Sequence, residues 1–227
     1  MAQISFNGFR TFSITACFAV LGMVWGSTPA ADLWVEIKEP DDAGVENAIV
    51  EVSKLDPPPL AATPPVAQEM RQSGKAFRPF VLVVPVGASV DFPNQDPFRH
   101  HVYSFSKPKP FELKLYGQSD IPKVVFDQPG IVALGCNIHD QMRGYIYVTA
   151  APRYGLTDGS GSVGLKDLAP GKYRATVWHP DLRNAGGVEP QDFAMPESGD
   201  HHLQFRIELK PAMPKAAPSE FDNAGEY

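Results

Sequence analysis

Short runs rich in β-branched and aromatic residues recur along most of the chain, separated by Pro, Gly, Asn and Asp. Runs of this length and composition, punctuated by turn-forming residues, are typical of β-strands. No window carries an apolar stripe at helical spacing over a useful length. The pattern predicts an all-β fold, with strands in segments such as NAIVEV (47–52), FVLVVPVG (80–87), HVYSFS (101–106), GIVALGC (130–136) and GYIYVTA (144–150).

The residue composition changes after Val148, where TAAPRYGLTDGSGS has the composition of a hinge. Beyond it, HLQFRIEL (202–209) alternates strictly between polar and apolar residues, as a half-buried strand does. We therefore predict two β-sandwich units. Their expected ranges are 32–150, with a proline-rich insertion at about 53–77, and 151–211, followed by a disordered tail over 212–227.

The N-terminus has the three parts of a secretory signal peptide. Arg10 precedes an apolar run over 11–25, and small residues then offer cleavage sites at the end of segment 1–31. This predicts a periplasmic protein with no integral membrane span after signal removal. Removal also takes Cys17, so Cys136 becomes the only cysteine of the mature chain, and no disulfide can form within it.

The charge balance is mildly acidic. The full chain has 20 Lys and Arg against 26 Asp and Glu, a net charge of −6, and loss of Arg10 with the signal leaves 19 against 26, or −7. No basic run occurs in the sequence. This argues against nucleic acid as a partner.

Candidate chemistry is concentrated in GCNIHDQMRGY (135–145), which holds Cys136, His139 and Met142 at intervals of three residues. Two histidines and one cysteine in a plane, with a long axial methionine, describe a blue-copper electron-transfer site. The second histidine has to come from His100 or His101 in NQDPFRHHV; adjacent strand residues face opposite sides, so both should not reach one metal. Zinc is the second choice, because structural zinc sites rarely use a thioether.

These segments resemble those of the cupredoxins. CNIHDQMRG is similar to the copper loop of amicyanin, NQDPFRHHV to the family's Asn-x5-His segment, and VVFDQPGIVALGC to the strand that leads to the cysteine. The resemblance covers about 80–149 well and 32–52 loosely, as an opening strand. It implies a cupredoxin Greek-key β-sandwich that binds one copper ion, with His100, Cys136 and His139 as equatorial ligands and Met142 as the axial ligand. His101 stands where the family usually has Asn, in a hydrogen-bonding position beside the ligands.

The chain as a whole is similar to methylamine-utilisation and plastocyanin-like proteins, which implies a periplasmic carrier of single electrons rather than an enzyme. Redox proteins such as a cytochrome c or a periplasmic dehydrogenase would be its partners. A copper-binding carrier or sensor without redox traffic would share every ligand and stays open. The segment TDGSGSVGLKDLAPGKYRATVW (157–178) resembles the transthyretin-like and carboxypeptidase-regulatory sandwiches.

Overall fold

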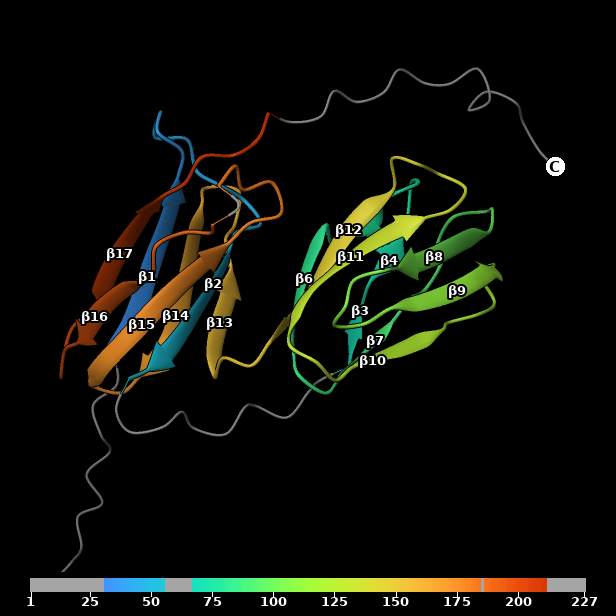
Figure 1. Cartoon of the computed structure of the whole chain (residues 1–227). Coiled ribbons are helices and arrows are strands. Elements are labelled where there is room, and N and C mark those ends of the chain that lie inside the picture. Colours follow the sequence, from blue (N-terminus) through green and yellow to red (C-terminus); the bar gives the residue numbers. More distant parts are fainter. Residues whose placement is uncertain (1–30, 56–66, 185, 212–227) are drawn as a thin grey trace, which may run out of the picture.

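The computed structural model describes residues 31–55, 67–184 and 186–211, and these residues form seventeen β-strands arranged as two β-sandwiches (Figure 1). The all-β prediction is confirmed. Within the described ranges, no helix has the length and apolar character needed to cross a membrane. The predicted signal peptide, apart from Ala31, and the predicted tail lie outside the described residues.

The first sandwich is built from both ends of the described chain, and we call it the split sandwich. One of its sheets has the strand order β14-β1-β17 and the other the order β13-β2-β15-β16. The strands are β1 (Ala31–Lys38), β2 (Ile49–Lys54), β13 (Arg153–Leu156), β14 (Ser162–Leu168), β15 (Gly171–Trp178), β16 (Gln191–Met195) and β17 (His201–Arg206).

The second sandwich is formed by the chain between β2 and β13, and we call it the inserted sandwich. It has a five-stranded sheet of order β6-β12-β11-β8-β9, a three-stranded sheet of order β10-β7-β3, and the small hairpin β4-β5. The strands are β3 (Gln68–Glu69), β4 (Arg71–Gln72), β5 (Phe77–Arg78), β6 (Val81–Pro85), β7 (Ala88–Asp91), β8 (His100–Ser104), β9 (Phe111–Tyr116), β10 (Lys123–Phe126), β11 (Gly130–Cys136) and β12 (Arg143–Thr149).

The pairing of β1 and β2 differs from the predicted division of the chain at residue 150. β1 pairs antiparallel with β14 and parallel with β17, and β2 pairs with β13 and β15. Leu33, Val35 and Ile37 alternate into a core shared with strands near the C-terminus. Segment 32–52, expected as an opening strand of the copper unit, therefore lies in the other sandwich. Alternation fixes which face of a strand is buried, but it does not name the sheet that covers that face.

Each sandwich has its own core of buried apolar side chains. The core of the inserted sandwich includes Phe92, Phe126 and Ile146, all with no exposed surface, and it extends to Cys136 and Met142 at one end. Part of the predicted proline-rich insertion contributes to this core, because Met70 and Phe77 are buried in it. Only residues 56–66 of that segment lie outside the described structure.

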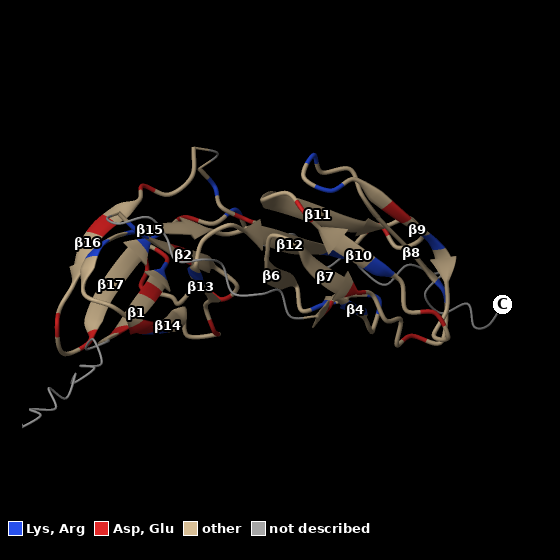
Figure 2. Ribbon diagram, turned by 90° about the horizontal axis from the view of Figure 1, so that it is seen from below, with Lys and Arg blue, Asp and Glu red and all other residues tan. Residues whose placement is uncertain are grey.

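The two sandwiches contact each other through β12 and β2. Glu51 on β2 accepts hydrogen bonds from the hydroxyls of Tyr147 and Thr149 on β12, the first over 3.0 Å. The ring of Trp178 on β15 lies 5.9 Å and 5.4 Å from the rings of Tyr145 and Tyr147. Charged residues are scattered over both sandwiches in mixed sign (Figure 2).

Candidate metal centre

The two adjacent histidines of β8 face opposite sides of the sheet, as strand geometry requires. His100 has no exposed surface, whereas the side chain of His101 retains 19% of its exposure and bonds Glu112 on β9 through Nε2 over 2.8 Å. The pairing with β9 shifts register between His100 and Val102, but the inward direction of His100 is kept. The expected inward position of His100 is therefore observed, and the hydrogen bond expected of His101 beside the ligands goes to Glu112 instead.

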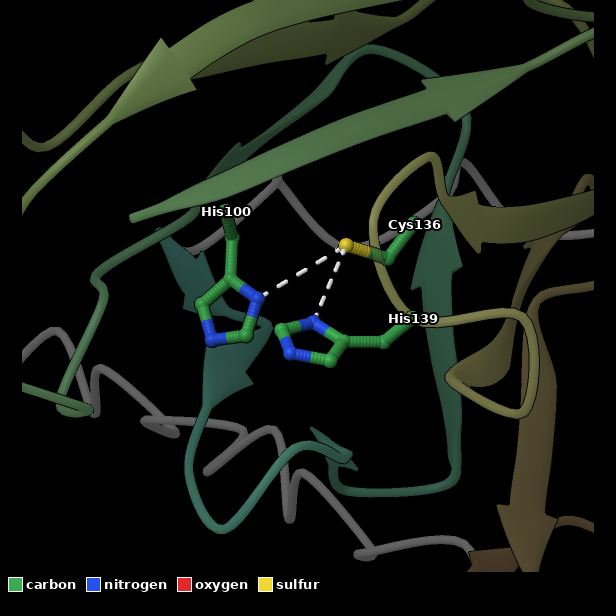
Figure 3. A group of neighbouring side chains, drawn as sticks. All are labelled: His100, Cys136 and His139. Carbon is green, nitrogen blue, oxygen red and sulfur yellow. Dashed lines mark hydrogen bonds between the residues drawn. The ribbon is translucent and has the colours of Figure 1, made fainter. Parts of the chain in front are cut away.

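Cys136 and His139 come from the end of β11 and the turn that follows it. Cys136 is the last residue of β11 and pairs with Val102 on β8, which places it beside His100. The following turn is closed by a hydrogen bond from the Met142 amide to the His139 carbonyl over 2.9 Å. Figure 3 shows both imidazole rings turning a nitrogen toward the Cys136 sulfur.

The spacing of these atoms fits a metal ion between them. The Cys136 Sγ lies 3.6 Å from the Nδ1 of His100 and 3.7 Å from the Nδ1 of His139, and all three donors lie within 4.8 Å of one another. Bonds of about 2.0 Å to nitrogen and about 2.3 Å to sulfur, at about 110–120°, separate a nitrogen ligand from a sulfur ligand by about 3.5–3.7 Å. Two imidazoles and one thiolate are the equatorial donors of a blue-copper site.

The surroundings of Cys136 favour its thiolate. Burial raises the pKa of the thiol, but the hydrogen bond with His100 and the backbone N–H groups of His101 and Ile138 outweigh it, so the pKa lies below its usual value. The thiolate is the form that binds metals. Cys136 is buried, and it is the one cysteine among the described residues.

His100 is held from its other side by Asp96. The Nε2 of His100 lies 2.9 Å from the Oδ2 of Asp96, and both side chains are buried. Burial lowers the pKa of His100, but its contacts with Cys136 and Asp96 raise the pKa by more than burial lowers it. The pKa of His100 therefore lies above its usual value. Asp96 stands four residues before His100 in the sequence, but nothing in the alternation of that segment indicates that the two side chains meet.

Phe98 covers the two imidazoles from outside. Its ring lies 5.2 Å from that of His100 and 5.5 Å from that of His139, and 37% of the residue is exposed. His139 is only partly buried and lines a 320 Å³ hollow together with Ile138. The centre is therefore deep on the Cys136 and His100 side and close to the surface on the His139 side.

Met142, the predicted axial ligand, is 2% exposed and belongs to the same buried core as Cys136. Its backbone amide bonds the His139 carbonyl as described above, so Met142 lies in the same turn as His139, after the strand that ends at Cys136. Its thioether as an axial ligand stays a prediction.

Comparisons with known proteins give partial likenesses. No protein-family model matches the chain, and no curated protein does. Among solved structures, a Cu-containing nitrite reductase (NirK) from Thermus scotoductus SA-01 is 31% identical over 40% of this chain and 25% of its own length, with a TM-score of 0.36. The chain therefore spans about a quarter of that protein.

Two other solved structures are smaller. A purple cupredoxin from Nitrosopumilus maritimus is 23% identical over 37% of this chain and all of its own, with a TM-score of 0.33. A reduced amicyanin variant is 21% identical over 44% of this chain and 99% of its own, with a TM-score of 0.34. Likeness at this level leaves the assignment of a function to the geometry of the site.

Proposed function

We propose that the inserted sandwich holds one copper ion and that the protein carries single electrons between redox proteins. One observation carries the proposal: two imidazole nitrogens and one sulfur already stand at metal-binding distances from each other, on elements fixed by the sheet. His100, Cys136 and His139 would hold the ion in a plane, and Met142 would be the axial ligand. Copper, when bound, supplies a one-electron couple.

The residues of this chain account for the other requirements of electron transfer. Cys136 and His100 are set by neighbouring strands β11 and β8, so a change of charge at the site meets ligands that do not have to move. Burial of Cys136 and His100 excludes water from that side of the site, while partly exposed His139, with the ring of Phe98 beside it, lies near the surface. A partner protein docking over His139 would therefore approach the centre most closely.

The natural partners under this proposal are redox proteins, such as a cytochrome c or a periplasmic dehydrogenase, and the place of work is the periplasm. Support for that location comes from the signal-like segment at the N-terminus. A copper carrier or sensor is the second candidate. The buried thiol of Cys136 and imidazole of His100 favour electron transfer over copper delivery, because an ion enclosed by the sheet and the turn dissociates slowly to another protein.

The proposal is tested by adding Cu(II) to the metal-free protein and recording the absorption spectrum. We expect a strong thiolate-to-copper band toward the red end of the visible range, with one copper per chain. His100→Ala should abolish the band, because it removes a buried donor, and His101→Ala should keep it, because His101 faces Glu112. The reverse outcome would place the ligand at His101.

Met142→Leu provides a further check on the ligand set. Loss of a weak axial donor that favours Cu(II) should keep the colour and raise the reduction potential. An unchanged or lower potential would remove Met142 from the ligands. Transfer of the ion to a chelating acceptor faster than electron exchange with a small redox reagent would favour the carrier alternative.

A further inference from the structure

We propose that Asp96 is a positioning residue for the metal centre: its carboxylate fixes the tautomer and orientation of His100, and the hairpin β4-β5 holds that carboxylate in place through two backbone amides. The inference rests on the proposed function for its copper readouts. It concerns a residue outside the four candidate ligands and a segment that the sequence pattern predicts as an insertion.

The first step is the tautomer of His100. A neutral imidazole has one N–H donor and one acceptor nitrogen. An ionised carboxylate can only accept, so the 2.9 Å contact with Asp96 requires the proton of His100 on Nε2. The lone pair is then left on Nδ1, the atom 3.6 Å from the Cys136 sulfur. This is the form of histidine that binds a metal through Nδ1.

The second step is the ionisation of Asp96. Its carboxylate takes three N–H donors: the Gly74 amide at 2.7 Å on Oδ1, the Lys75 amide at 3.1 Å on Oδ2, and His100. A buried carboxylate with its oxygens occupied by donors is a fixed negative charge.

The third step is the hairpin that supplies the two amides. Gly74 and Lys75 both have positive φ, of 65° and 55°, and their successive N–H groups converge on the carboxylate in the manner of a backbone anion nest. The hairpin is anchored by Gln72, which has no exposed surface and accepts a hydrogen bond from the Tyr116 hydroxyl over 2.5 Å. Phe77 anchors the other strand in the core.

The consequence is electronic as well as geometric. A carboxylate that accepts the outer N–H of a metal-binding histidine raises the basicity of the ligand nitrogen, and removing such a partner typically weakens metal binding about 10–100-fold. The added negative charge favours the more highly charged ion, Cu(II). Asp96→Asn should therefore weaken Cu(II) binding about tenfold. If Cu(I) binding is unchanged, a tenfold loss raises the reduction potential by about 59 mV.

The chain offers a matched control at the neighbouring histidine, His101. Glu112 bonds His101 over 2.8 Å, so Glu112→Gln removes a carboxylate–imidazole pair of nearly the same length whose imidazole lies on the opposite face of β8 from His100. We expect the potential of Glu112→Gln to stay close to that of the unmodified protein. A potential shift in Asp96→Asn no larger than the shift in Glu112→Gln would overturn the proposal.

A second measurement needs no copper. Nitrogen NMR of the full-length, metal-free protein reports which imidazole nitrogen of His100 carries the proton. We expect the neutral imidazole of His100 to carry its proton on Nε2 and not on Nδ1, and we expect loss of this preference in Asp96→Asn but not in Glu112→Gln. A neutral imidazole with its proton on Nδ1 in the unmodified protein would overturn the inference even if Asp96→Asn does not fold. Because the tautomer is measured without metal, failure of the copper proposal is separated from failure of this one.

Discussion

Glu51 joins the two sandwiches, and its removal should destabilise the whole chain. It lies on β2 of the split sandwich and accepts hydrogen bonds from Tyr147 and Thr149 of the inserted sandwich. Burial, together with the charge of Glu51, raises the pKa of the Tyr147 hydroxyl, which therefore stays a hydrogen-bond donor over the physiological range. Glu51→Ala leaves both hydroxyls of β12 without this acceptor.

The size of the effect follows from the two bonds. A hydrogen bond to a charged group contributes about 1.5–3 kcal/mol, and an ordinary one about 1 kcal/mol. Thr149 keeps a second partner, because its hydroxyl also accepts the Ala151 amide over 2.9 Å. We therefore assign about 2 kcal/mol to Tyr147 and about 1 kcal/mol to Thr149, or about 3 kcal/mol for Glu51→Ala. At about 2–4 °C per kcal/mol for a chain of this size, Tm should fall by about 6–12 °C.

Differential scanning calorimetry of the metal-free protein measures this fall. Glu36→Ala is the control, since Glu36 is an exposed glutamate of β1 in the same sandwich whose partner, Lys38, is on the same strand. Surface substitutions of this kind usually change stability by less than about 0.5 kcal/mol. A Tm for Glu51→Ala as high as that for Glu36→Ala would refute the claim that these hydrogen bonds hold the sandwiches together.

Two further predictions follow from the strand pairing and from His179. A fragment of residues 67–150 should bind copper and show the colour of the full chain, because it contains the whole inserted sandwich. The fragment 31–150 should be less soluble than the fragment 67–150, since its β1 and β2 lose the strands that pair with them. Equal solubility of the two fragments by ultracentrifugation would contradict this pairing. His179 should make stability fall with acid: burial lowers its pKa, and its Nδ1 accepts the Asp181 amide. Below about pH 6.5 the unfolded chain binds a proton at His179 more readily than the folded chain does, so the free energy of unfolding from urea titrations should drop toward pH 5. A His179→Gln variant whose unfolding free energy falls equally with pH would show that another group is responsible.

Much of the inserted sandwich could be predicted from the sequence because its strands are short, β-branched and bounded by turn residues. The pleat alone predicts that only one of His100 and His101 faces the site, and the resemblance to the Asn-x5-His segment selects His100. The structure places His100 beside Cys136 and His139. These are local consequences of alternation and spacing, which a single sequence carries.

The features that could not be predicted depend on contacts between distant segments. β1 has the alternation of a half-buried strand, but its partners β14 and β17 lie more than a hundred residues away. The carboxylate of Asp96 is held beside His100 by two amides of the hairpin β4-β5. The two strands of this hairpin are only two residues long and follow a proline-rich stretch, so the sequence pattern does not reveal them. Neither pairing leaves a periodic signal in the sequence.

The central claim is that His100, Cys136 and His139 hold one copper ion that changes charge by a single electron. Its most direct test is a redox titration of the copper-loaded full chain, followed at the thiolate-to-copper band. We predict one copper per chain and a band that bleaches and returns reversibly with the uptake and loss of one electron. A copper-loaded protein that shows no such band, or whose band does not return on reoxidation, would contradict the assignment.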